Sequence, residues 1–150
     1  MTIRKARVQD APSMHKLINS YADKKLMLSK ALSEIYDHLS DFFVVEENKK
    51  IVGCCGLHVT WEDLAEIRSL AVDTKTKGKG YGVKLMKTCH KEAKKLGVKN
   101  VFALTLIPEF FKKLGYHEVS RDKLPHKVWT DCIKCPIFPD CNEVPLMKQL

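Results

Sequence analysis

The sequence predicts one domain of the α/β (α+β) class, with helices flanking a mixed, mostly antiparallel sheet. Three observations carry this expectation. The 150 residues are 45% hydrophobic and 29% charged, which suits a chain with a single core. Segments with strand and helix patterns alternate along the chain up to residue 119. The early strand segments are joined as hairpins, so they should pair antiparallel.

Local patterns set the expected elements. Strands are expected at 2–8, 42–46, 50–59, 64–72, 99–106, 116–119 and 143–148. Helices are expected at about 10–21, 29–39, 80–96 and 108–113. Asp10 is a good N-cap for the first helix, which carries Pro12 in its first turn, and Gly97 ends the third. The third helix joins two strands that should therefore be parallel.

A glycine-rich turn between a strand and the third helix has the pattern of a phosphate site. The stretch 65–82, AEIRSLAVDTKTKGKGYG, ends with Gly78, Gly80 and Gly82 at alternate positions. Glycine lets the backbone approach a ligand closely. The first turn of the helix offers unpaired N–H groups and the positive end of its dipole to an anion. Five lysines gather around this turn, which fits a small polyanionic cofactor: Lys75, Lys77, Lys79, Lys84 and Lys87.

The formal net charge of +8 makes nucleic acid an alternative partner. Few aromatic residues interleave with the lysines, however, and stacking on bases needs them, so we expect no nucleic acid. No run of about 18 apolar residues exists, so we expect no membrane span. The N-terminus MTIRKARVQD lacks the apolar core of a secretory signal, which places the protein in the cytoplasm.

Three motifs, in this order along the chain, resemble the GNAT superfamily of N-acetyltransferases. They are the hairpin VVEENKKIVGCCGL at 44–57, LAV at 70–72 followed by KGKGYG at 77–82, and FFKKLGY at 110–116. A lone glycine turn is a weak signal, whereas three motifs in the right order and spacing are a strong one. The resemblance covers the chain from residue 3 to about residue 119 and implies acetyl-CoA as co-substrate.

The resemblance also implies which residues hold this cofactor. In the family, the strand before the glycine turn pairs its backbone with the pantetheine arm, and the turn amides hold the pyrophosphate. The first role maps onto Leu70, Ala71 and Val72, and the second onto Lys77, Gly78, Lys79, Gly80, Tyr81, Gly82 and Val83. Lys77 stands where the family usually has Arg or Gln, whose planar side chains hold phosphate more specifically.

A closer resemblance is to the acetyltransferase domain of bacterial N-acetylglutamate synthase. It rests on IRKARVQDAPSMHKLI, LSDFFVVEENKKIVGCCGL, AEIRSLAV and FALT, with LP at 124–125. That family acetylates the α-amine of glutamate in the first step of arginine biosynthesis. The chain resembles a short, stand-alone form of that enzyme, without the kinase-like domain of the long form. Inhibition by arginine through that domain is therefore not assumed.

The resemblance assigns the general base to Glu66. Acetyl transfer needs an unprotonated amine, and near pH 7 an α-amino group is mostly ammonium. Glu66 maps onto the position proposed as base in the synthase, where it acts directly or through water. Without the resemblance, Glu66 reads as a surface or salt-bridged residue on a half-exposed strand.

The thiolate leaving group needs a partner that the usual position does not supply. The GNAT closing motif often carries a Tyr that protonates the thiolate, but Phe111 occupies that position and has no proton to give. The synthase-like enzymes use a hydroxyl at the end of the fifth strand, which maps onto Thr105. A Thr hydroxyl is a poor acid, so we expect a hydrogen bond to the thiolate more than full transfer. The alternative is a β-branched residue that favours a strand.

Three cations are candidates for binding the carboxylates of a small-molecule amino-acid substrate. Lys30 aligns with a substrate-binding Arg of the synthase, Arg68 lies two residues after Glu66, and Lys127 follows the LP pair. Other readings remain open. One is a GNAT enzyme for another small amine or a protein N-terminus; another is a non-catalytic acetyl-CoA-binding or basic nucleic-acid-binding module. The oligomeric state is also open, a homodimer included.

The end of the chain, 121–150, is expected to be an irregular, Cys- and Pro-containing tail packed on the single domain 1–150. Cys132, Cys135 and Cys141 have the spacing C-x2-C-x5-C. A structural zinc site needs four ligands, so we expect no metal unless another residue completes the set. His126, Cys54 and Cys55 are the candidates for a fourth ligand.

Overall fold

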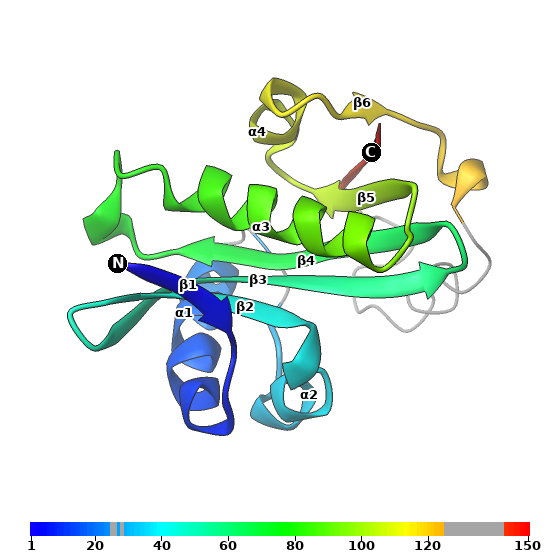
Figure 1. Ribbon diagram of the computed structural model, residues 1–150. Helices are drawn as coiled ribbons and strands as arrows, with labels where there is room; N and C mark the ends of the chain where they lie inside the picture. Colours follow the sequence, from blue (N-terminus) through cyan, green and yellow to red (C-terminus); the bar gives the residue numbers. More distant parts are fainter. Residues whose placement is uncertain (25–26, 28, 125–142) are drawn as a thin grey trace.

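A computed structural model describes residues 1–24, 27, 29–124 and 143–150 (Figure 1). Within these residues, seven strands form one sheet in the order β1-β2-β3-β4-β5-β7-β6. The strands are β1 (Thr2–Lys5), β2 (Phe42–Glu47), β3 (Lys50–Trp61), β4 (Leu64–Val72), β5 (Asn100–Thr105), β6 (His117–Glu118) and β7 (Val144–Gln149). The α-helices are α1 (Ala11–Asp23), α2 (Leu32–Asp37), α3 (Tyr81–Lys95) and α4 (Pro108–Lys113), and two short 3-10 turns matter below, η2 (Leu39–Asp41) and η3 (Thr74–Thr76).

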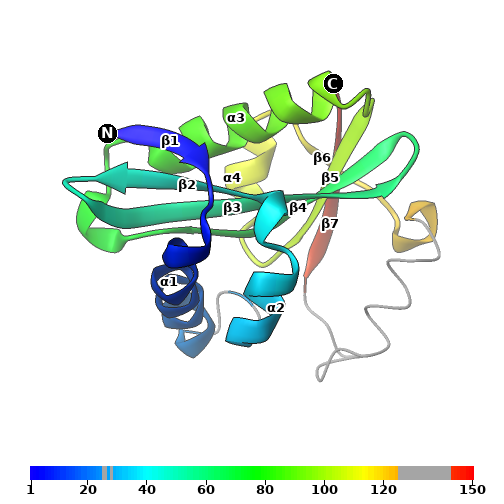
Figure 2. The same cartoon turned by 60° about the horizontal axis from the view of Figure 1, so that its bottom comes forward.

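Helices cover both faces of the sheet. In Figures 1 and 2, α3 and α4 lie on one side and α1 and α2 on the other. The core beneath α3 contains Leu85 and Met86, and the core beneath α1 and α2 contains Met14 and Ile18. Because side chains alternate along a strand, adjacent residues of β3 serve different cores. From residue 54 to residue 58 of β3, the even-numbered residues therefore lie on the α1/α2 face of the sheet.

The two central strands separate along their length, and this shapes the middle of the molecule. β4 and β5 pair in parallel from Leu64–Asn100 to Glu66–Phe102, and in the described structure no strand pairs with β4 on that side beyond Glu66. Figure 2 shows β5 running obliquely away from β4. In β4, the register against β3 slips near Ser69, whose φ is 52°, as in a β-bulge. The separation leaves backbone groups of β4 without a strand neighbour toward β5.

The predicted fold class is confirmed, and β4 and α4 begin and end where the sequence predicts. The predicted parallel pairing of the strands on either side of α3 is also confirmed. The last strand, β7, lies within the sheet, between β5 and β6. No helix in the described residues is long and apolar enough to cross a membrane.

Some local predictions need correction. The first strand ends at Lys5 and not at residue 8, and the second helix spans Leu32–Asp37 and not 29–39. Asp10 immediately precedes α1, as predicted, but its side chain does not cap that helix. Its carboxylate accepts hydrogen bonds from the Arg4 guanidinium at 2.7 and 3.1 Å and from the Arg7 N–H at 2.7 Å. The hydrogen bond from Arg4 and the one from the Arg7 backbone hold the pKa of Asp10 below its usual value of 3.8, although burial opposes them. A nearly buried ion pair thus joins β1 to the start of α1.

Replacing Asp10 by asparagine is expected to lower the free energy of unfolding at pH 7 by roughly 1–3 kcal/mol, because Arg4 loses its nearer carboxylate and keeps only Glu46, at 3.4 Å. The pKa of Asp10 is lower in the folded state, so its contribution is complete above pH 3.8 and is lost as pH falls through the folded value. Urea unfolding between pH 7 and pH 3 measures both effects. Wild-type stability should fall more steeply on acidification than that of Asp10→Asn; equal slopes would contradict the assignment.

Candidate active site

The glycine turn is built by local hydrogen bonds that end β4 and start α3. The Asp73 carboxylate accepts from the Lys75 N–H at 2.9 Å, and the Thr76 hydroxyl donates to the Asp73 carbonyl at 2.7 Å. Gly78 and Gly80 have φ values of 90° and 75°, in the left-handed region that glycine adopts without strain. α3 then begins at Tyr81, and N–H groups in its first turn have no carbonyl one turn earlier to bond.

A second set of contacts ties this turn to the hairpin between β2 and β3. The Glu47 carboxylate accepts hydrogen bonds from the Lys79 ammonium at 3.0 and 3.1 Å and from the Tyr81 hydroxyl. The bonds from Tyr81 and Lys79 hold the pKa of Glu47 below its usual range. The charge of Lys79 is therefore already balanced within the chain. Lys77, also predicted to bind phosphate, is exposed.

The predicted pantetheine strand has one backbone position that is already occupied. The Tyr21 hydroxyl, from α1, donates to the Val72 carbonyl and accepts from the Val72 N–H at 3.4 Å. Ala71 pairs with Cys54 of β3. A pantetheine arm that paired with Val72 would therefore share or displace the Tyr21 hydroxyl.

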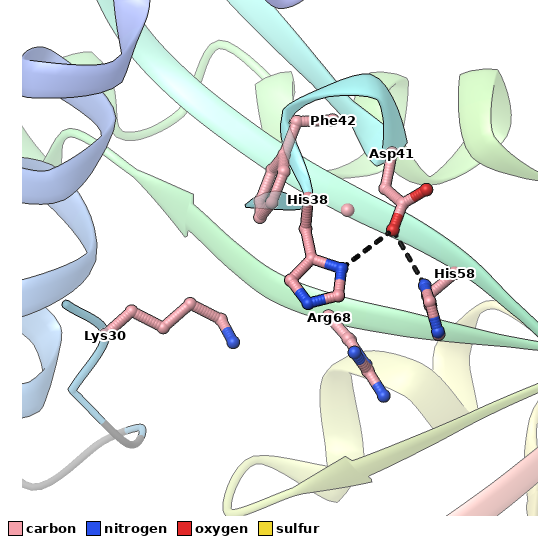
Figure 3. Close-up of a pocket in the computed structure, with 7 residues that line it drawn as sticks. Lys30, His38, Asp41, Phe42, His58 and Arg68 are labelled. Atoms are coloured by element: carbon pink, nitrogen blue, oxygen red, sulfur yellow. Dashed lines mark hydrogen bonds and ion pairs between the residues drawn. The ribbon is translucent and has the colours of Figure 1, made fainter. Parts of the chain in front are cut away.

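A pocket opens on the α1/α2 face of the sheet (Figure 3). It contains about 220 Å³ of empty space, the solvent at its mouth included, and its lining comes from the segment before α2, the end of α2, η2, β2, β3 and β4. The lining residues are Lys30, His38, Asp41, Phe42, Gly56, His58 and Arg68. A side chain at Gly56 would place its Cβ 3.2 Å from the Phe42 ring, so glycine at this position keeps the pocket floor open.

The pocket brings together two cations that the sequence singled out separately. Lys30 and Arg68 both line it, although they are 38 positions apart in the chain. The backbone of Lys30 is held by Asn19 of α1, which donates to its carbonyl at 3.1 Å and accepts from its N–H at 3.2 Å. Arg68 Nε donates to Glu66 Oε1 at 2.6 Å, so the predicted base lies directly beside the pocket.

Sequence patterns assigned no role to His58, Asp41 or His38. His58 lies opposite Glu66 in the β3–β4 register, and its Nδ1 is 2.7 Å from Asp41 Oδ2. His38 Nδ1 is 3.6 Å from the same oxygen. A signal for His58 existed in the sequence, because an antiparallel hairpin between the strands 50–59 and 64–72 places a residue opposite Glu66. To identify that residue as His58, the pairing register of the two strands must be known, and the sequence alone does not determine it.

Thr105 stands apart from the pocket. It is buried at the end of β5, and its hydroxyl oxygen accepts a hydrogen bond from the Ile107 N–H at 2.9 Å. Strand alternation places it with Val101 and Ala103 on the α3 face, whereas Glu66 belongs to the opposite face. The structure therefore does not gather the two predicted catalytic side chains. Glu66 lies on β4 and Thr105 on β5, so the separation between these two strands runs between them.

The aromatic residues of the closing motif form core contacts. Phe111 and Tyr116 are 4% exposed, and their rings meet edge to face at 5.2 Å. The Tyr116 hydroxyl lies 2.6 Å from His90 Nε2, and burial raises the pKa of Tyr116. Burial, assisted by Lys148 and Lys94, lowers the pKa of His90 to about 4. Tyr116 therefore packs in the core, with its hydroxyl against His90.

The remaining predicted positions fall partly outside the described residues. Lys127 and the tail cysteines Cys132, Cys135 and Cys141 lie there. Cys54, Cys55 and Cys89 are buried free thiols inside the fold. Burial raises the pKa of the Cys54 thiol to about 12, so it is held in the unreactive protonated form.

Comparison with known proteins agrees with this geometry. Residues 38–118 match the acetyltransferase (GNAT) domain family. The chain is 37% identical to an uncharacterized N-acetyltransferase of Chlorobaculum tepidum over 99% of its own length and 96% of that protein's. It is 36% identical to an amino-acid acetyltransferase of Mycobacterium tuberculosis, over 86% of this chain and 75% of that one.

A solved structure shares the fold of this chain. The fold matches N-acetylglutamate synthase from Neisseria gonorrhoeae, complexed with coenzyme A and N-acetyl-glutamate, with a TM-score of 0.92 and 27% identity. The match covers 99% of this chain and 35% of that one, so the chain spans about a third of the gonococcal protein. The chain belongs to the GNAT family of N-acetyltransferases.

Replacing Glu47 by glutamine is expected to raise the KM for acetyl-CoA by about 2- to 5-fold, because the glycine turn loses its ionic contact with the β2–β3 hairpin. The change frees Lys79 and Tyr81 from the hairpin and loosens the glycine turn. The value of kcat should stay within about 2-fold of wild type, since the contacts of Glu47 are to Lys79 and Tyr81 and not to the pocket lined by Lys30 and Arg68. Initial rates at varied acetyl-CoA measure both constants. Glu118→Gln, on exposed β6, is the matched control; an equal rise there would contradict the assignment.

Proposed function

We propose that the protein transfers the acetyl group of acetyl-CoA to the α-amine of L-glutamate and forms N-acetylglutamate, the first step of arginine biosynthesis. The observation that carries this proposal is the pocket beside Glu66, which holds Lys30 and Arg68 on one face of the sheet. Two carboxylates on one small substrate need two cationic or N–H-rich contacts. A polyamine would meet like charge in this pocket.

The acetyl donor is acetyl-CoA. Two features support it: the separation between β4 and β5, which leaves backbone groups of β4 without a strand neighbour, and the glycine turn at the start of α3. The pantetheine arm extends along Leu70, Ala71 and Val72. The pyrophosphate takes the N–H groups of the turn from Lys77 to Val83. The gonococcal relative, solved with coenzyme A, supports the same assignment.

Glu66 and Thr105 divide the proton chemistry between them. Glu66, positioned by Arg68, removes a proton from the ammonium group directly or through a water, so that the free amine attacks the thioester carbonyl. The C–S bond then breaks, and the thiolate leaves toward the end of β5. The Thr105 hydroxyl, whose oxygen already accepts from Ile107 N–H, still has its own proton for a hydrogen bond to the sulfur.

Release of free coenzyme A thiol tests the proposal. The protein is incubated with acetyl-CoA and each of the twenty common amino acids in turn, and thiol release is followed with a disulfide reagent. Glutamate should give the highest kcat/KM of the panel. The absence of glutamate-dependent release, with another amine preferred, would reject glutamate as the acceptor while keeping the acetyltransferase chemistry.

A further inference from the structure

A histidine–aspartate pair lies in the acceptor pocket and has no part in the mechanism above. His58 Nδ1 lies 2.7 Å from Asp41 Oδ2, and the His58 side chain is 20% exposed at the pocket wall. In Figure 3, the His58 ring turns its other nitrogen away from Asp41. Because an ionised carboxylate only accepts, Nδ1 carries the proton and the neutral ring has its lone pair on Nε2. Asp41 therefore fixes both the tautomer and the orientation of the ring.

The pair stands next to the predicted base. His58 and Glu66 are directly opposite in the β3–β4 register, so their Cβ atoms are about 4.5–5.5 Å apart on the same face. Arg68 lines the pocket with His58 and bonds Glu66 at 2.6 Å. The proton that Glu66 takes from the substrate is thus delivered beside an imidazole whose Nδ1 is held by the Asp41 carboxylate.

We propose that His58, oriented by Asp41, is the proton relay of this site: it receives the substrate proton from Glu66 and releases it to solvent. This inference rests on the proposed acetyl transfer to an amino acid. The proton count balances: the ammonium nitrogen loses two protons when it becomes an amide nitrogen. One proton ends on the departing sulfur, and the other passes from Glu66 to His58 Nε2 and then to water. His58 is a positioning residue, since it acts through Glu66.

The charges around His58 are consistent with this role. Asp41 faces it from η2, His38 from the end of α2, Glu66 and Arg68 from β4, and Lys30 from the segment before α2. His38, Asp41 and His58 also have the donor types of a divalent-metal site, with their ligand atoms within 4.8 Å of one another. Lys30 and Arg68 in the same pocket oppose a divalent cation, so the relay is the reading that the charges favour.

The pH dependence of kcat tests the relay, with the amino acid that the wild type uses best. His58→Gln is expected to lower kcat by about 10-fold or more at pH 7 and to remove one ionisation from the acid limb. The deficit should shrink toward pH 9.5, where the amine is increasingly free. Asp41→Asn should move the acid limb, because the imidazolium loses its carboxylate. His117→Gln, an exposed histidine on β6, should match wild type throughout.

Further measurements separate the relay from its alternatives. In His58→Ala, added imidazole should restore part of kcat, since a small base can replace the missing ring. Parallel pH profiles for wild type and His58→Gln would overturn the relay and leave the acetyltransferase function intact. Dialysis against a chelator should leave the activity unchanged; loss of activity that zinc restores would overturn the relay in favour of a metal site. A wild type that acetylates no amino acid would reject both proposals. Circular dichroism confirms that each variant is folded.

Discussion

Replacing Glu66 by glutamine is expected to lower kcat for glutamate by about 10²-fold or more at pH 7, with the KM for acetyl-CoA within about 2-fold of wild type. The substitution keeps the shape and a hydrogen-bond acceptor for Arg68 but removes the basic carboxylate. The effect on kcat should decrease toward high pH, where a larger share of the substrate amine is free. Steady-state rates from pH 6 to pH 9.5 measure this dependence.

The control for this experiment must separate a lost base from a disturbed ion pair. Glu66→Asp retains the carboxylate but shortens its reach, so it should keep the pH profile of wild type with a lower kcat. If Glu66→Gln shows an unchanged profile and a small loss of kcat, Glu66 is a structural partner of Arg68 and the base lies elsewhere.

Replacing Arg68 by glutamine should raise the KM for glutamate by about 30-fold or more, since truncating one member of a hydrogen-bonded, largely buried charge pair costs roughly 2–5 kcal/mol. The expected loss combines a missing cation for a substrate carboxylate with a disturbed Glu66. The side chain of Arg68 lies in the acceptor pocket and away from the glycine turn, so the KM for acetyl-CoA should change by less than about 3-fold. Initial rates with each substrate varied in turn separate the two constants.

Two further variants sharpen this test. Arg68→Lys retains the charge but loses the fork of donors, so it should fall between wild type and Arg68→Gln. Lys113→Gln removes an exposed cation of α4 outside the pocket and should leave both constants unchanged. An equal rise in Arg68→Gln and Lys113→Gln would mean that general charge, and not the pocket, attracts the substrate.

Local signals were enough to predict the elements that hold the cofactor turn. The strand pattern of residues 64–72, the glycines after it and the helical spacing that follows are all read within a few residues of one another. The prediction therefore found β4 and α3 and the order between them. The place of β7 between β5 and β6 depends on pairing with residues far away in the chain, and no local pattern determines that.

The acceptor pocket was only half predictable. Lys30 was singled out through a resemblance and Arg68 by its position two residues after Glu66, and the structure brings them to the same pocket. His58 and Asp41 come together because η2 ends beside β3 in the folded chain, a contact between residues 17 positions apart. The positive φ of Ser69 likewise has no signal in the sequence, since glycine is the usual residue there. Tertiary register decides which polar residues share a face, and the sequence alone does not fix it.

The direct test of the central claim is the identity of the product. The protein is incubated with acetyl-CoA that carries a ¹³C label in the acetyl group and with L-glutamate, and the mixture is analysed by NMR and mass spectrometry. The account predicts one labelled acetyl group on the α-nitrogen of glutamate, formed in equal amount to free coenzyme A. Coenzyme A released without labelled N-acetylglutamate, or a label on another amine in preference, would contradict it.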